Sequence, residues 1–498
     1  MDTGANTEKT NAHIFSLREL VIFGLAFMTP AAPALIYGDL VKRSGGAPSL
    51  VYAVAFFVIL FTVQSYGKLS RAFNGPVCLY VRESVNRYAG IVAGWSSGMF
   101  YILASALAFS IGAHFASDAL PSIPRFVWAL SFAAVSGAVL LLGRRATAIM
   151  NAAAVYLVTA ITAVYILVCV FAAYRGTGIG LVISEIPLQP TGGRLDAILT
   201  GGSLACLSFL GFDAIAAISD EARNAKKNVG RAMFIACAVA GILFFLQAYA
   251  SSLIRPGLFE FTASSVALFD VGNKAGGPPM VYLCIAALII SALSVGTAGQ
   301  LAACKTIDLL WQSEAPPRMR NMPRLLKGKA RGRVGALPCV LLATCAIAAA
   351  NVAAPAATDG LSASLTDLVQ FFGCFCFVLI NAAAMIHFYF KKKRRHIFTG
   401  LLFPALGFFS SLYLWIHIRP AAFQIGLPAL IPCVVWLIPH IFRAVKARMA
   451  GTRTQESDGG STLPETPAEE TSDGENPASE PSARECAKPL SSARRTDK

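Results

Sequence analysis

The sequence predicts an all-α polytopic membrane protein with about twelve transmembrane helices. Of its 498 residues, 55% are hydrophobic and only 14% are charged, whereas about a quarter of the residues in an ordinary soluble protein are charged. Many apolar runs reach the roughly 20 residues that span a bilayer. The alternating ten-residue segments of a membrane β-barrel are not visible. The lipid bilayer is therefore the expected surrounding of the chain.

The apolar runs give the expected spans in chain order, separated by short polar or basic stretches. A basic connector, 65–73, follows the second span, and a polar stretch ending at Gly277 precedes the eighth. The expected spans are 17–41, 48–66, 89–115, 125–142, 148–174, 200–221, 231–253, 280–301, 337–351, 365–390, 397–416 and 421–442.

Proline interrupts the first span. Pro30 and Pro33 lie in its middle, and each removes a backbone donor and clashes with the preceding turn. We expect the helix to break there.

The sixth span, Thr200–Glu221, is interrupted by Ser208 and Gly211 and carries Asp213 deep inside. A charged side chain at that depth costs roughly 2.5–3.5 kcal/mol on insertion scales, so it marks a functional site by default. Glycine loosens the helix where backbone groups can turn toward a ligand. The alternative is a kinked helix in which a neighbour hydrogen-bonds Asp213.

The two interrupted spans stand five spans apart, which predicts an inverted-repeat transporter with its site near the bilayer midplane. An odd number of spans per repeat gives the two halves opposite orientations. Half-helix N-termini carry partial positive charge and free N–H groups, which suit a substrate carboxylate. Two unrelated kinked helices are the alternative.

Lysine and arginine gather in alternate loops, which places those loops and both termini in the cytoplasm of a protein of the cell membrane. The net charge of the whole chain is +15. The tail 451–498 has ten acidic and six basic residues, so the rest of the chain is more basic than this sum, and the tail is expected to be disordered. Nucleic-acid binding is not expected, because the basic blocks are short and separated by spans. The basic loops follow spans two, four, six, eight and ten, at Arg71, Arg82 and Arg87; Arg144 and Arg145; Arg223, Lys226, Lys227 and Arg231; Arg318–Arg333; and Lys391–Arg395.

The twelve cysteines and six histidines indicate neither a disulfide framework nor a metal site. No cofactor is expected. A membrane-embedded enzyme would need a polar constellation at depth, such as histidine with carboxylates, and a channel would need a repeated filter motif. Neither pattern is present, so an enzyme and a channel are both disfavoured.

Four patches of the sequence are informative together: Gly24–Pro30, Ser65–Arg71 with Phe73, Gly94–Ser97, and Ser208–Ala214. They resemble the amino acid–polyamine–organocation transporters, especially the branch with bacterial putrescine importers and amino acid permeases. The resemblance covers residues 17–390, and the combination of patches is more specific than any one of them. Glu221, Asn224, Lys227 and Val229 also fit the family's signature after the sixth helix.

The resemblance implies a five-plus-five inverted-repeat core of LeuT type, with discontinuous helices one and six and two further helices. The implied organisation is a cytoplasmic segment 1–16, a core 17–390, helices eleven and twelve at 391–443, and a cytoplasmic tail 444–498. Unwound backbone of helices one and six would hold the substrate, with Trp95 and Met99 as candidate pocket walls. The carried-over substrate-binding residues are Met28, Thr29, Ala31, Ser208, Phe209, Gly211 and Phe212, to which we add Asp213.

The chain departs from the family on the cytoplasmic side, which concerns gating and coupling more than the site. Ala225 and Gly230 stand where the family usually has prolines. The family's Ser-Arg pair near the end of helix eight appears as Cys304-Lys305.

Substrate charge follows from the number of buried anions. A polyamine has at least two cationic ends, each needing an anionic or aromatic partner, but only Asp213 lies deep in the membrane. Phe100 also stands where putrescine-type relatives have an acid. We therefore expect uptake of a neutral or apolar amino acid, with polyamine import, amino acid/polyamine exchange and a non-transporting sensor as alternatives.

The coupling ion is left open between H⁺, through Asp213, and Na⁺. A sodium site would use Ser291, Ser294 and Thr297 of the eighth span, facing the break in helix one. Hydroxyl groups that only pack helices together are the alternative reading of these residues. Exchange without an ion is a third alternative.

Overall fold

Apolar runs become helices in this protein because a bilayer offers no water to satisfy exposed backbone groups. The structure is a computed structural model and describes residues 15–180, 183–190, 195–254, 266–314, 336–353, 359–391 and 397–438. Those ranges contain no β-strand, and a single bridge joins Phe15 to Ala222. The expected segment 1–16, apart from its last two residues, and the expected tail 444–498 lie outside them.

Within the described ranges, nine helices are long and apolar enough to cross a membrane. A bent pair adds a tenth span, and two shorter apolar helices, Leu337–Val352 and Gly400–Ile416, coincide with the expected ninth and eleventh spans. The helices are α1 (Leu17–Met28), α2 (Pro33–Arg43), α3 (Pro48–Ala72), α4 (Val77–Ser84), α5 (Arg87–Ala119), α6 (Arg125–Leu142), α7 (Arg144–Tyr174), α8 (Leu195–Cys206), α9 (Ala214–Ala217), α10 (Ala225–Ile254), α11 (Ala267–Gly276), α12 (Pro278–Glu314), α15 (Leu337–Ala353), α16 (Asp359–Met385), α17 (Phe403–Ile416) and α18 (Pro420–Gly426). The last span continues from α18 to Ile438.

Helix starts follow from local capping. Ser16 precedes α1 and forms a capping box with Glu19, in which each side chain bonds the other residue's backbone N–H. Asn86 precedes α5, and its Oδ1 accepts from the N–H of Ala89 at 2.8 Å.

The expected short basic amphipathic connector at 65–73 forms the last part of α3, which continues as one helix to Ala72, beyond the expected end of the second span at 66. Tyr66 and Leu69 are fully buried there, so the segment has an apolar face to pack. Close approach to α10 is permitted by glycine: a Cβ built on Gly230 would lie 2.8 Å from the Cα of Gly67. The expected polar stretch before the eighth span likewise contains a short helix, α11.

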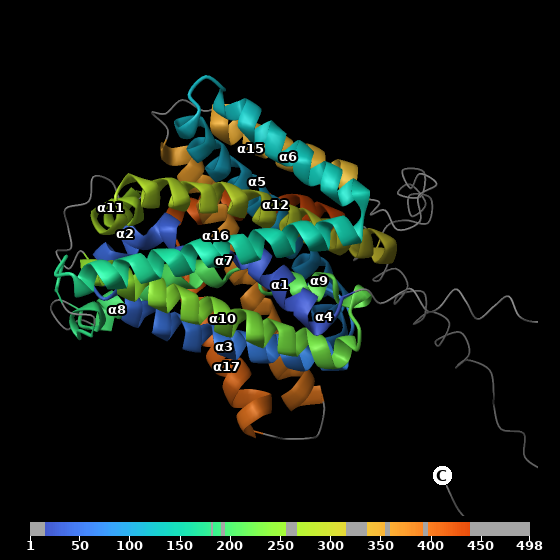
Figure 1. The fold of residues 1–498 in the computed structure, drawn as a ribbon. Helices are drawn as coiled ribbons and strands as arrows, with labels where there is room; N and C mark the ends of the chain where they lie inside the picture. The colour runs from blue at the N-terminus through green and yellow to red at the C-terminus, as the bar shows by residue number, and fades with distance from the viewer. Residues whose placement is uncertain are drawn as a thin grey trace, which may run out of the picture. The chain divides into compact units, whose positions relative to one another are not determined.

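Long helices lie side by side around the two broken spans (Figure 1). Helix α5 packs along α12, and α3 packs along α10. A hydrophobic core of buried side chains includes residues from both broken spans. A second cluster joins α5, α6 and α15, where buried Gln300 accepts from Ser136 at 2.5 Å and donates to Thr344 at 2.8 Å. The broken spans are thus embedded in a braced helical frame.

Candidate functional site

The first span breaks where proline predicted. Helix α1 ends at Met28 and α2 begins at Pro33, with a 59° bend between them. Thr29 has φ 45°, a conformation that costs a β-branched residue of the order of 1–3 kcal/mol. Its Oγ1 lies 2.7 Å from Oγ of Ser291 and accepts a long hydrogen bond, 3.4 Å, from the N–H of Ala31. The break is therefore held by side-chain hydroxyls.

The sixth span breaks at Leu210–Asp213, between the short 3-10 turn Leu207–Phe209 and α9. Gly211 has φ 114°, which non-glycine residues rarely adopt. A Cβ built on Gly211 would also lie 1.8 Å from Cδ1 of Phe27. Glycine is thus required here twice, once for its conformation and once for the close approach of the first span.

Asp213 lies directly after this break and is 1% exposed. The hydroxyl group of Tyr101 on α5 donates to its Oδ2 at 2.7 Å. Oδ1 has no hydrogen-bond partner among the described residues. A neighbour does bond Asp213, as the kinked-helix alternative required, but one carboxylate oxygen is left over.

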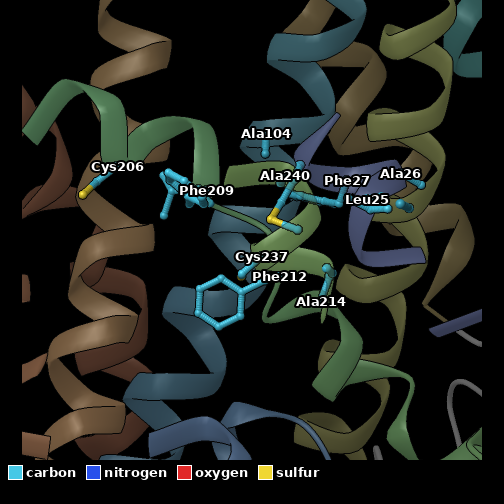
Figure 2. Close-up of a cluster of buried hydrophobic side chains, with 14 of the residues drawn as sticks. Leu25, Ala26, Phe27, Ala104, Cys206, Phe209, Phe212, Ala214, Cys237 and Ala240 are labelled. Atoms are coloured by element: carbon cyan, nitrogen blue, oxygen red, sulfur yellow. The ribbon is translucent and has the colours of Figure 1, made fainter. Parts of the chain in front are cut away.

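Both broken spans contribute aromatic side chains near the breaks, among them Phe27, Phe209 and Phe212 (Figure 2). Phe209 packs on Phe244 with centroids 5.2 Å apart, and Phe212 lies 5.3 Å from Phe377 and 5.4 Å from Tyr66. Ser208, the polar residue of this stretch, pairs its hydroxyl with Tyr52 at 3.1 Å. Among the described residues of the two breaks, the buried side chains are consequently apolar apart from the hydroxyls of Thr29 and Ser208 and the carboxyl group of Asp213.

The structure does not bring Trp95 to the two breaks. Its Nε1–H donates to the carbonyl of Ala429 at 3.1 Å. Its ring packs against a cluster that includes Ile91 of α5 and Cys433 of the last span. Met99 is partly buried against the main core. Its neighbour Phe100 lies by the first break, 5.8 Å from the ring of Phe27.

Two of the three candidate hydroxyls on α12 face the first span. Ser291 meets Thr29, and Ser294 donates to the carbonyl of Ala26 at 3.2 Å. Thr297 instead donates to Ser136 on α6 at 2.9 Å and to the carbonyl of Leu293. The two serines are thus grouped with the break, and the threonine belongs to the frame.

Residues 20–426 match the amino acid permease family. The chain belongs to this family. The permease is 26% identical over 420 residues to the low-affinity putrescine importer PlaP of Escherichia coli K12, covering 83% of this chain and 90% of PlaP. It is 24% identical over 281 residues to the methylthioribose transporter of Bacillus subtilis 168, covering 52% of this chain and 58% of the relative.

The fold is similar to that of Mhp1, a nucleobase-cation-symport-1 family transporter solved in a closed conformation with bromovinylhydantoin bound. The TM-score is 0.50 at 14% identity, over 85% of this chain and 93% of that structure. The predicted fold class is confirmed: a helical membrane protein of LeuT type with discontinuous first and sixth spans. The permease is therefore a multi-pass membrane transporter and not an enzyme.

Ion pairs lie near the beginnings of α7 and α16. At the end where α7 begins, Lys305 contacts Glu221 and lies 3.0 Å from Asp220, while Arg144 lies 3.3 Å from Glu221. At the end where α16 begins, Nε of Arg419 lies 2.9 Å from Asp367. Both central breaks are therefore flanked by charged contacts.

Sequence reasoning missed Tyr101, Phe27 and the pairing of Lys305. No sequence motif marks a tyrosine as the donor to a carboxylate on another helix, so the sequence could not identify Tyr101 as the partner of Asp213. For Lys305 the sequence did give a signal, because this residue departs from the family pattern within the last three turns of α12.

Proposed function

We propose that this permease is a secondary active transporter that takes up an amino acid, with a neutral or apolar one favoured, by alternating access. The observation that carries the proposal is Asp213, a buried carboxyl group beside two helix breaks with one oxygen unbonded among the described residues. Such a group is expensive in a membrane and suits a cationic ammonium group.

The remaining candidate residues form the surroundings of that ammonium group. The 3.4 Å contact from Ala31 N–H to Thr29 is long, so this donor is the one most readily turned toward a substrate carboxylate, beside Met28 and Thr29. Ser208, Phe209, Gly211 and Phe212 line the opposite break. The aromatic rings of Phe209 and Phe212 favour a substrate with an apolar side chain over one with a second charged group.

A polyamine is the second candidate substrate, as importer or exchanger. Similarity to PlaP over most of both chains favours it. A diamine would need a second partner for its far ammonium group, and the aromatic rings of Phe212, Tyr66 and Phe377 are the candidates for a cation–π contact. A sensor that binds its substrate but does not move it across the membrane would differ from an amino acid transporter and from a polyamine transporter by the absence of substrate flux.

For the coupling ion, two sites compete. Asp213 would carry a proton, whereas Na⁺ would take the carbonyl of Ala26 and the hydroxyls of Ser291 and Ser294, replacing the hydrogen bond that Ser294 now makes.

The loop charges favour a cell-membrane protein with both termini cytoplasmic. In that orientation the Lys305 cluster faces the cytoplasm. The proposed organisation is a core of 17–390 followed by two helices to 443.

Uptake into proteoliposomes tests the proposal. Purified permease would be given labelled leucine or labelled putrescine, with an inward proton gradient, an inward sodium gradient or neither. Leucine uptake that one gradient stimulates supports the main proposal and names the ion. Putrescine uptake alone overturns the preference for an amino acid, and binding without flux of either compound favours the sensor.

A further inference from the structure

The phenyl ring of Phe27, in the last turn of α1, lies in a slot that two glycines leave open. A Cβ built on Gly211 would lie 1.8 Å from its Cδ1, and one built on Gly299 would lie 2.8 Å from its Cε2. Gly211 belongs to the break of the sixth span and Gly299 to α12. The ring therefore fills a space made by two separate elements, and its side chain is only 4% exposed.

The same ring contacts the aromatic pair on α5. Phe27 meets Tyr101 edge-on, with centroids 5.9 Å apart and planes at 83°, and lies 5.8 Å from Phe100. Phe100 and Tyr101 are themselves 5.2 Å apart. Tyr101 is the donor to Asp213, so Phe27 supports the ring that carries that donor (Figure 2 shows Phe27 beside the break).

The hydrogen bonds of Ser105 hold the backbone of Tyr101 and not its ring. Ser105 donates to the carbonyl groups of Tyr101 and of Gly296, which fastens α5 to α12. A fixed backbone still allows the tyrosine side chain to change rotamer. The rotamer that reaches Asp213 is thus chosen by the rings packed against it.

We propose that Phe27 is a positioning residue that holds the Tyr101 hydroxyl on Asp213 and so couples the first span to the carboxyl group. Alternating access moves one helix bundle against the other around the site. Displacement of α1 withdraws the ring from the glycine slot and frees Tyr101 to rotate. Asp213 then has both oxygens available for a cation. This meaning for transport rests on the proposed function, but the coupling itself is testable without substrate.

The test is the reaction of Asp213 with dicyclohexylcarbodiimide, an apolar reagent that adds to buried carboxyl groups. Purified full-length permease would be treated without substrate, and modification of the peptide carrying Asp213 would be followed by mass spectrometry. The loss of a hydrogen bond to a carboxylate changes the equilibrium between bonded and free carboxylate by a factor of about ten or more. We therefore expect Phe27→Leu and Tyr101→Phe each to speed modification about tenfold.

The double variant decides between positioning and general loosening. If Phe27 acts through Tyr101, Phe27→Leu adds little in the Tyr101→Phe background, so the double variant reacts about as fast as either single one. Multiplying effects, or a Phe27→Leu protein that reacts at the wild-type rate, would overturn the proposal. Phe23→Leu is the matched control, because Phe23 lies one turn earlier on α1 and is equally buried at 3%.

Two further measurements keep the outcomes separate. Should Phe27→Leu fail to fold, Phe27→Met, with an adaptable unbranched side chain, takes its place with the same expected rates. Uptake of labelled leucine and putrescine by the same variants is measured in parallel. The predicted modification pattern without any uptake refutes the transport proposal alone. Uptake together with effects of the two substitutions that multiply in the modification rate refutes the positioning role alone.

Discussion

Replacing Asp213 by asparagine removes a negative charge from the centre of the protein while nearly preserving shape. The Tyr101 hydroxyl can still donate to an amide oxygen in the place of Oδ2, which it now meets at 2.7 Å. The free energy of unfolding should therefore change by less than about 1 kcal/mol.

The substrate's ammonium group, in contrast, would lose its buried counter-charge. Removing one partner of such a pair costs about 2–5 kcal/mol, which corresponds to an affinity loss of roughly 30- to several-thousand-fold. The KM for labelled leucine in proteoliposomes should rise by at least the lower figure, with a nearly unchanged midpoint of thermal unfolding.

Asp118→Asn is the matched control. Asp118 is half exposed and pairs with Arg125 at 3.4 Å, a contact worth at most about 1 kcal/mol at a surface. It should leave the KM unchanged. An Asp213→Asn protein whose KM and maximal rate both stay within twofold of wild type would refute the assignment of Asp213 to the substrate.

Three further predictions follow from the same geometry. Gly211→Ala should abolish folded transporter or uptake, because its φ of 114° and its contact with the first span exclude a Cβ; Gly202→Ala, with nothing within 4 Å of its built Cβ, should behave as wild type in the same expression and uptake assays. If Na⁺ is the coupling ion, Ser294→Ala should weaken the sodium stimulation of uptake by about tenfold, which corresponds to the loss of one ligand contact of about 1.4 kcal/mol. Thr297→Ala should not weaken it, because the hydroxyl group of Thr297 faces α6. Equal effects of the two substitutions would contradict this sodium site. Gln300→Leu should lower the thermal unfolding midpoint, at about 1–3 kcal/mol, because the buried Ser136 hydroxyl loses its acceptor and the Thr344 hydroxyl loses a donor. The KM for leucine should not change; a changed KM would place Gln300 in the transport pathway.

Breaks and spans could be predicted from the sequence because their causes are local. Proline removes a donor wherever it stands in a helix, so the break after Met28 follows from Pro30 and Pro33 alone. Asp213 could be singled out for a similar reason, because a carboxyl group inside an apolar run is costly in any membrane protein. These statements needed no knowledge of neighbouring helices.

The partners of those residues could not be predicted, because they come from helices far apart in the chain. Tyr101 is 112 residues from Asp213, and nothing in its own stretch distinguishes it from other buried tyrosines. Trp95 shows the converse error: an indole near a family motif suggested a pocket wall, but its N–H reaches Ala429, 334 residues away. Helix rotation decides which side chain faces the centre, and a near-continuous apolar helix such as α5 gives little periodic signal to fix that rotation.

The contact of Trp95 also bears on the two spans outside the repeat. Asn381 on the tenth span donates to Thr62 on α3 at 3.0 Å and to Ser411 on α17 at 3.3 Å. A Cβ built on Gly407 would lie 2.5 Å from Oδ1 of Asn381, so glycine lets α17 approach closely. Arg419, at the start of the twelfth span, pairs with Asp367 on the tenth. The eleventh and twelfth spans therefore attach to the tenth span at both its middle and its end. Because α3 shares the Asn381 contact, a motion of α3 past the tenth span would break a buried hydrogen bond of a side chain that also bonds α17. If transport proceeds by the alternating access proposed above, the added spans therefore contribute to the energy of that motion.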